Sequence, residues 1–128
     1  MLFYNSLYKI ISSEKNDAGF NMKLEINHSH PIFKGHFPGS PVLPGVVMLH
    51  IIRECVETTF DDGSIFDFKE IKQCKFPMPI AMEEDRTVLL NFSVQQIDDM
   101  HFNLSATMKD ESAIFAILKS ILLKTNNE

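Results

Sequence analysis

The stretch that organises this chain is Gly35-His36-Phe37-Pro38-Gly39-Ser40-Pro41-Val42-Leu43-Pro44-Gly45. It places one histidine among three glycines and three prolines. Proline fixes φ and removes a backbone donor, whereas glycine permits conformations that other residues avoid. A loop of this composition has few shapes and can therefore hold the His36 imidazole in one place. An acid–base catalyst needs this, because its geometry must be set before the chemistry begins.

The apolar run after the loop predicts a buried helix. Most of its positions are apolar, so it is apolar around most of its circumference, as a buried helix is: Val46, Val47, Leu49, Ile51, Ile52 and Val56. Pro44 and Gly45 stand at its start, where proline is tolerated, and residues 61–64 (Asp-Asp-Gly-Ser) end it. A single helix of about 15 residues is expected.

Strands are predicted on both sides of this helix. Residues 2–12 are apolar and aromatic, residues 12–17 form a polar turn, and residues 22–27 alternate apolar with polar side chains, so an antiparallel pair precedes the loop. The strands predicted after the helix are 69–76, 86–97, 100–109 and 112–124. The last is apolar on both faces, which suits a central strand or a dimer seam, although a helix remains open for it.

This order predicts an α+β fold, in which one curved antiparallel sheet wraps around a central helix. With 128 residues, the chain fits a single domain over 1–128.

No apolar stretch is long enough to span a bilayer, and no signal peptide is recognisable, so a cytoplasmic protein is expected. Cys55 and Cys74 match no metal spacing and are interpreted as reduced packing thiols. The net charge of −5 argues against nucleic acid as a partner.

The loop resembles the signature of the β-hydroxyacyl-acyl carrier protein dehydratases (FabZ/FabA-like), glycine-histidine-phenylalanine-proline-glycine-x-proline-x-x-proline-glycine. All eight specified positions are met. A chance match is on the order of one in a billion, given the ordinary usage of these residues. The family's later lysine-x-proline has a counterpart in Lys75-Phe76-Pro77. The resemblance implies the hot-dog fold over nearly the whole chain.

The resemblance also implies a chemistry, the dehydration of 3-hydroxyacyl thioesters in fatty acid or related lipid or polyene biosynthesis. His36 takes the position of the base, and the backbone amide of Gly45 that of the donor to the thioester oxygen. A helix N-terminus suits developing negative charge, because it offers free N–H groups and a partial positive charge. No metal or organic cofactor is implied, because the thioester already activates the carbon that loses its proton.

One position departs from the family pattern. Fourteen residues after the loop histidine the family has a glutamate or aspartate, and here that residue is His50. An imidazolium can donate a proton, so His50 is either the acid or the holder of the water that accepts the hydroxyl. Otherwise it is a buried helix residue in a site that has lost dehydration. Glu54, one turn further on the same helix face, is an alternative carboxylate.

Residues for the acyl chain, the carrier and a second subunit follow from the same resemblance. The acyl chain is expected to contact Phe37, Pro44, Val46, Met48, Phe76 and Pro77, with Met78 and Ile80 nearby, although core packing is the favoured explanation for most such residues. An acyl carrier protein is acidic and would dock on a basic patch formed by Lys34, Lys69, Lys72 and Lys75, although a solvated strand edge explains these lysines equally well. The donor is an acyl carrier protein or an acyl-CoA thioester. A homodimer is expected, with His36 of one chain facing His50 of the other.

Two alternatives stay open. A hot-dog thioesterase would use a helix carboxylate, here Glu54 or Glu57, to activate water. An inactive subunit would complete a heterodimer with an active relative or bind an acylated carrier, and the histidine at position 50 supports that interpretation. His28 and His30 are interpreted as a polar strand edge rather than metal ligands, with no carboxylate at useful spacing, and His101 as exposed.

Overall fold

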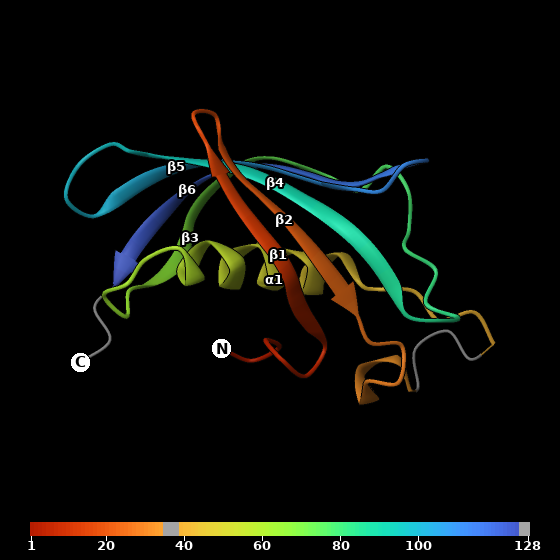
Figure 1. The fold of residues 1–128 in the computed structure, drawn as a ribbon. Helices are drawn as coiled ribbons and strands as arrows, with labels where there is room; N and C mark the ends of the chain where they lie inside the picture. Colours follow the sequence, from red (N-terminus) through yellow and green to blue (C-terminus); the bar gives the residue numbers. More distant parts are fainter. Residues whose placement is uncertain (35–38, 126–128) are drawn as a thin grey trace.

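The computed structural model describes residues 1–34 and 39–125. It contains six strands and one α-helix over these ranges: β1 (Tyr8–Asn16), β2 (Gly19–Ile26), the short 3-10 helix η1 (Pro31–Phe33), α1 (Gly45–Thr58), β3 (Ile65–Lys75), β4 (Arg86–Gln96), β5 (His101–Lys109) and β6 (Ile114–Thr125). The strands form one antiparallel sheet in the order β1-β2-β4-β5-β6-β3. The sheet curves around α1, as the sequence predicted (Figure 1).

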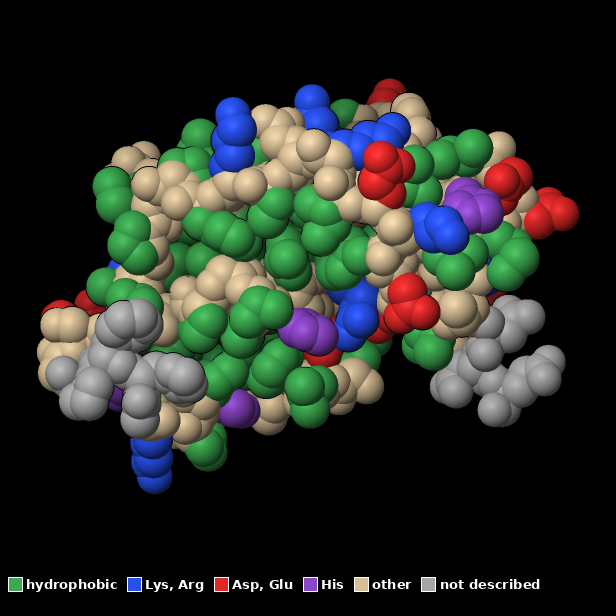
Figure 2. All heavy atoms as spheres, turned by 180° about the vertical axis from the view of Figure 1, so that it is seen from behind, with side chains coloured by type: hydrophobic (Ala, Val, Ile, Leu, Met, Phe, Trp, Pro, Cys, Tyr) green, Lys and Arg blue, Asp and Glu red, His purple; other side chains and the backbone are tan. Residues whose placement is uncertain are grey.

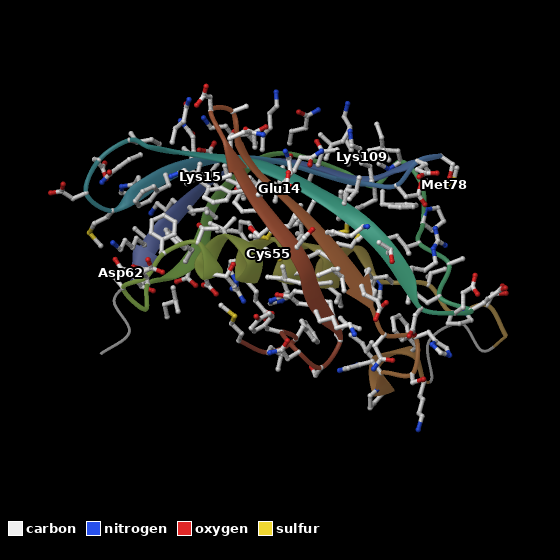
Figure 3. The ribbon with its side chains drawn as sticks, viewed as in Figure 1. Glu14, Lys15, Cys55, Asp62, Met78 and Lys109 are labelled. Atoms are coloured by element: carbon white, nitrogen blue, oxygen red, sulfur yellow. The ribbon has the colours of Figure 1, made fainter. Side chains whose placement is uncertain are left out.

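The helix α1 is the centre of the core. Its buried apolar side chains include Ile51, Ile52, Cys55 and Val56, each with no exposed surface. They meet the inward-facing side chains of the strands, such as Leu24, Val88, Leu90, Met108 and Leu118. In Figure 3 Cys55 lies on α1 beneath the sheet, whereas Lys109 lies on the convex side. The alternation of apolar and polar residues in the strands therefore reflects a sheet that covers a helix on one face only.

The predicted polar turn at residues 12–17 is wrong in extent. The strand β1 continues to Asn16 and pairs with β2 as far as Gly19. The reversal is made by Asn16, whose Oδ1 accepts hydrogen bonds from the N–H groups of Ala18 and Gly19 at 2.8 and 3.0 Å. Because β1 is the edge of the sheet, its polar side chains are solvated and give no apolar alternation to recognise.

Three strands begin at other residues than predicted: β1 at Tyr8 rather than residue 2, β2 at Gly19 rather than residue 22, and β3 at Ile65 rather than residue 69. The strand predicted over 112–124 is confirmed as β6, and it is a central strand between β5 and β3. No helix in residues 1–34 or 39–125 is long and apolar enough to cross a membrane.

The edge strand β3 carries the largest irregularities. Its register against β6 shifts between Phe68 and Glu70 and again between Ile71 and Gln73, so Lys69 and Lys72 fall at bulges. Ile71 is 45% exposed, and Cys74 is exposed as well, although both are paired opposite core residues of β6. Cys74 is thus not a packing thiol within one chain, whereas Cys55 is. On the face shown in Figure 2, apolar side chains gather into a broad patch.

The central position of α1 predicts that replacing isoleucine by alanine lowers the free energy of unfolding much more in α1 than at the edge of the sheet. Ile51→Ala removes a fully buried side chain and should lower the free energy of unfolding by about 2–5 kcal/mol. Ile11→Ala should change it by at most about 0.5 kcal/mol, because Ile11 is half exposed at a bulge of the edge strand β1. Urea denaturation of both variants measures the difference, and equal losses would contradict the central role of α1.

Candidate active site

The described part of the signature loop fixes where α1 begins. Pro41 O accepts a hydrogen bond from Met82 N at 2.8 Å, and Leu43 N donates to Ile80 O at 3.0 Å. These bonds tie the loop to the segment that follows β3, so the chain enters α1 from a fixed direction. His36 and Phe37, the predicted base and a predicted substrate contact, lie outside the described residues.

The first turn of α1 leaves backbone donors available. Pro44 caps the helix without a side-chain hydrogen bond, and its carbonyl accepts from Val47 N and Met48 N at 3.1 and 3.2 Å. The Gly45 N–H has no acceptor among the residues that the structure describes. A Cβ at Gly45 would come within 2.7–3.0 Å of the Phe76 ring. The helix therefore begins with an amide that no described residue engages, at a position where the Phe76 ring leaves room only for glycine.

His50 lies on α1 one turn and a half beyond this amide, and it is half-buried. The Arg53 Nη2 lies 3.0 Å from His50 Nδ1. A guanidinium has donors only, so a hydrogen bond across this contact has Nδ1 as its acceptor. The Phe3 ring packs against His50 edge to face, with centroids 5.9 Å apart and planes at 76°.

The two carboxylates of α1, Glu54 and Glu57, accept hydrogen bonds from the protein's own backbone. Glu54 is 1% exposed and accepts hydrogen bonds from Leu2 N at 2.8 Å, Phe3 N at 3.1 Å and the Tyr8 hydroxyl at 3.1 Å. Burial, followed by the neighbouring Cys55 and Glu54, raises the pKa of Tyr8 far above its ordinary value, so Tyr8 is a permanent donor. Glu57 accepts from Phe66 N at 2.8 Å and is buried. The partners of Glu54 lie 46–52 positions away along the chain, so a local sequence pattern does not indicate them.

The thiol of Cys55, which follows Glu54 in α1, is unreactive near neutral pH. Burial raises the pKa of the Cys55 thiol to about 12, although its contact with Tyr8 acts in the opposite direction. The thiolate is the reactive form of cysteine, so Cys55 stays an inert part of the core near neutral pH. Both cysteines are free.

The predicted substrate contacts divide into two groups. Val46 and Phe76 are exposed by 62% and 41%, and Pro77 and Met78 are exposed beside them. Met48 and Ile80 are core residues of this chain, with 2% and 0% exposure. The exposed group lies at the start of α1 and just after β3, where it is open to solvent. The predicted basic residues are all exposed: Lys34, Lys69, Lys72 and Lys75.

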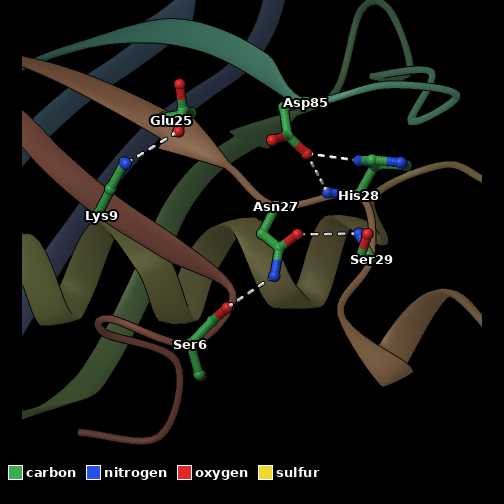
Figure 4. A network of polar contacts seen from close by, with 7 residues as sticks. All are labelled: Ser6, Lys9, Glu25, Asn27, His28, Ser29 and Asp85. Carbon is green, nitrogen blue, oxygen red and sulfur yellow. Dashed lines mark hydrogen bonds and ion pairs between the residues drawn. The ribbon is translucent and has the colours of Figure 1, made fainter.

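The other histidines are placed differently from the prediction. His28 and His30 lie in the turn after β2, not in a strand. His28 has a carboxylate partner after all, because its Nδ1 is 2.5 Å from Asp85 Oδ1 and its backbone N–H donates to the same oxygen (Figure 4). These two bonds lower the pKa of Asp85. His30 Nδ1 accepts from Ile32 N and caps η1.

His101, at the start of β5, is half-buried rather than exposed, and its ring bonds to Asp98. Within the described ranges, no three residues of the metal-binding types come together.

One curved antiparallel sheet of six strands around a single α-helix, over the residues that the structure describes, defines the hot-dog fold. Residues 12–116 match the ApeI-like family, described as ApeI dehydratase. The chain belongs to this family.

Curated relatives agree with this assignment. The 3-hydroxyacyl-[acyl-carrier-protein] dehydratase FabZ of Alkaliphilus metalliredigens is 32% identical over 73 residues, which cover 53% of this chain and 49% of that protein. The FabZ of Ehrlichia ruminantium (strain Welgevonden) is 26% identical over 125 residues, 88% of this chain and 85% of that protein. The match to the first of these relatives spans about half of its length, and the match to FabZ of Chlamydia trachomatis spans 61%.

Solved structures share the fold at low identity. A chain of the dehydratase heterocomplex ApeI:P from Xenorhabdus doucetiae has a TM-score of 0.60 and 19% identity, covering 89% of this chain and 96% of that one. The thioesterase HI1161 from Haemophilus influenzae has a TM-score of 0.61 and 12% identity, covering 94% and 80%. These neighbours confirm the predicted hot-dog fold.

The environment of Glu57 predicts a pH-dependent stability. Burial raises the pKa of this carboxyl, while the bond from Phe66 N and the charge of Arg53 act against the rise. The folded protein therefore holds the proton more tightly than the unfolded chain. The stability due to this group is present below about pH 4.5 and is lost as pH rises through the folded pKa.

Glu57→Gln keeps an oxygen acceptor for Phe66 N and removes the titration. Its Tm should exceed that of the wild type at pH 7 by on the order of 2–4 °C, and by less at pH 4. Scanning calorimetry at both pH values measures this. Glu14→Gln, at an exposed position of β1, is the control and should show no such trend. A wild type that is favoured over Glu57→Gln as pH rises would refute the assignment.

Proposed function

We propose that this chain is a 3-hydroxyacyl-acyl carrier protein dehydratase of fatty acid or related lipid or polyene biosynthesis, acting in the cytoplasm. The observation that carries the proposal is the joint presence of the complete signature loop and an amide at Gly45 with no acceptor in the described structure. The family and its FabZ relatives supply the reaction class. The thioester is carried by an acyl carrier protein or by CoA.

The proposed reaction uses the helix start for charge and His36 for the proton. His36 removes the proton next to the thioester carbonyl, and the Gly45 N–H stabilises the enolate oxygen that results. The electrons then form the double bond as the hydroxyl leaves from the next carbon as water. His50 faces that hydroxyl, as proton donor or through the water that it holds. Phe37, Pro44, Val46, Met48, Phe76 and Pro77 are proposed to contact the acyl chain.

The site is proposed to be completed by a second copy. The strand β3 is a long free edge of the sheet in the described structure, and exposed Ile71, Cys74 and Phe76 lie on it or just beyond it. Such an edge is a template for pairing with another chain. Pairing there would bring the exposed start of α1 against its partner, so His36 of one subunit would meet His50 of the other. Lys34, Lys69, Lys72 and Lys75 form the proposed carrier-docking surface.

A heterodimer is the second candidate, favoured by the histidine at position 50 and by the heterocomplex in which one ApeI relative occurs. In that case an active relative would supply the missing carboxylate. A thioesterase has weaker support, although one neighbour of the same fold is a thioesterase. A thioesterase would need Glu54 or Glu57 to activate water, and each of these carboxylates already accepts hydrogen bonds from backbone N–H groups.

Turnover tests the proposed reaction. The purified chain should convert 3-hydroxyacyl carrier-protein thioesters to the enoyl products, measured by mass spectrometry of the acyl carrier. His36→Ala should lower kcat by about a hundredfold or more, because a general base contributes 10²–10⁴-fold. His101→Ala, which alters a ring bonded to Asp98, should not change it. An inactive wild type that gains turnover on His50→Glu would show an intact scaffold whose acid was lost and would favour the heterodimer instead, and release of free thiol would favour a thioesterase.

Light scattering tests the dimer. The wild type should show twice the chain mass, and Ile71→Asp should shift it toward the monomer and lower turnover, because a carboxylate would be buried at the β3 edge. Ile11→Asp makes the same change on β1, the opposite edge of the sheet, and should remain dimeric. A monomeric and fully active wild type would contradict the shared site.

A further inference from the structure

The His50 ring is held on two sides by residues that the family signature does not contain. Arg53 lies one turn further along α1 and donates to Nδ1. The Nε of the same guanidinium is buried and has no partner in the described structure. Arg53 also forms no ion pair with any described residue, so the His50 nitrogen is its one hydrogen-bond acceptor there.

Phe3 closes the other side of the ring. It is 9% exposed and packs edge to face between His50 and His30, whose centroid lies 6.2 Å away. The position of Phe3 is fixed by Glu54, which accepts its N–H and that of Leu2. The Phe3 carbonyl in turn accepts a hydrogen bond from Leu7 N at 2.9 Å. The buried carboxylate thus acts on the site through the N-terminal segment and not by direct chemistry.

We infer that Arg53 is a positioning residue that keeps His50 a neutral imidazole with its proton on Nε2, and that Phe3 fixes the plane of that ring. The inference rests on the proposed function. A doubly protonated ring would point an N–H at the guanidinium and place two cations in contact, which this geometry opposes. The charged and titratable groups near the ring are Arg53 and Glu54 on α1 and His30 beyond Phe3. The Glu54 carboxylate is taken up by Leu2 N, Phe3 N and the Tyr8 hydroxyl, whereas Arg53 contacts the His50 ring directly.

This arrangement separates the two roles left open for His50. A neutral ring donates a hydrogen bond from Nε2 but does not supply the proton of the product water. The proton that His36 takes from the carbon next to the carbonyl is then the one returned to the leaving hydroxyl. The C–H electrons become the double bond, the C–O bond breaks with its electrons on oxygen, and His36 ends neutral. His50 holds the hydroxyl in line for this transfer.

Nitrogen-15 NMR of the imidazole rings tests the protonation state without any turnover. The His50 signals are assigned by their loss in His50→Gln. At pH 7.5 the wild type should show a protonated Nε2 and an unprotonated Nδ1, and Arg53→Met should shift the ring toward the other tautomer or toward the imidazolium. Arg86→Met is the matched control, because Arg86 bonds to Asp110 and Ala81 instead. A wild-type ring protonated on Nδ1 would overturn the inference.

The kcat and KM values of variants at His50, Arg53 and Phe3 provide a second test of the inference. His50→Gln keeps an N–H donor but cannot deliver a proton, so its kcat should stay within about tenfold of the wild type, while His50→Ala should lose on the order of a hundredfold. Arg53→Met should lower kcat and leave KM within about twofold, and Phe3→Ala should do the same with rescue by Phe3→Tyr. Equal, large losses in His50→Gln and His50→Ala would show that His50 is the acid and would overturn the inference. A wild type without dehydratase activity would refute the proposed function, while the NMR result would still decide the role of Arg53.

Discussion

The burial of α1 in the concave face of the sheet is the constraint on which the rest of this structure depends. One helix supplies the apolar surface that all the inward-facing strand residues need, and its own side chains Ile51, Ile52 and Val56 have no exposed surface. Because the helix is fixed along its length, its first turn and the amide of Gly45 are fixed as well. A stable core is in this way also a preorganised site.

Most helices and strands of this fold can be predicted from short-range patterns in the sequence. The proline- and glycine-rich loop followed by an apolar run predicted α1, and alternation predicted β4 and β5 within two residues of their ends. The polar end of β1 has the composition of a turn because an edge strand needs no apolar alternation. The segment of β6 admits a helix for the opposite reason, because Ile117, Ile121 and Leu123 on its outward face are apolar and half-buried, so the strand is apolar on both faces. Periodicity fails where a strand has no buried face or no exposed one.

The candidate site was predictable only as far as its motif reaches. The loop and the helix start follow from residues 35–45, and the histidine at position 50 follows from counting along the helix. The partners of the helix residues could not be predicted, because they come from distant segments. Glu54 binds Leu2, Phe3 and Tyr8, 46–52 positions away, and His28 binds Asp85, 57 positions away. An (i, i+3) contact such as that of His50 with Arg53 does lie within reach of helix geometry.

The central claim is that the thioester reacts at the start of α1, between the loop histidine of one subunit and His50 of another. A crystal structure with a non-hydrolysable 3-hydroxyacyl thioester analogue tests it most directly. The account predicts the thioester oxygen within about 2.7–3.2 Å of the Gly45 amide nitrogen, with the 3-hydroxyl on His50 Nε2. An analogue bound elsewhere, with the Gly45 amide unengaged, would contradict the account.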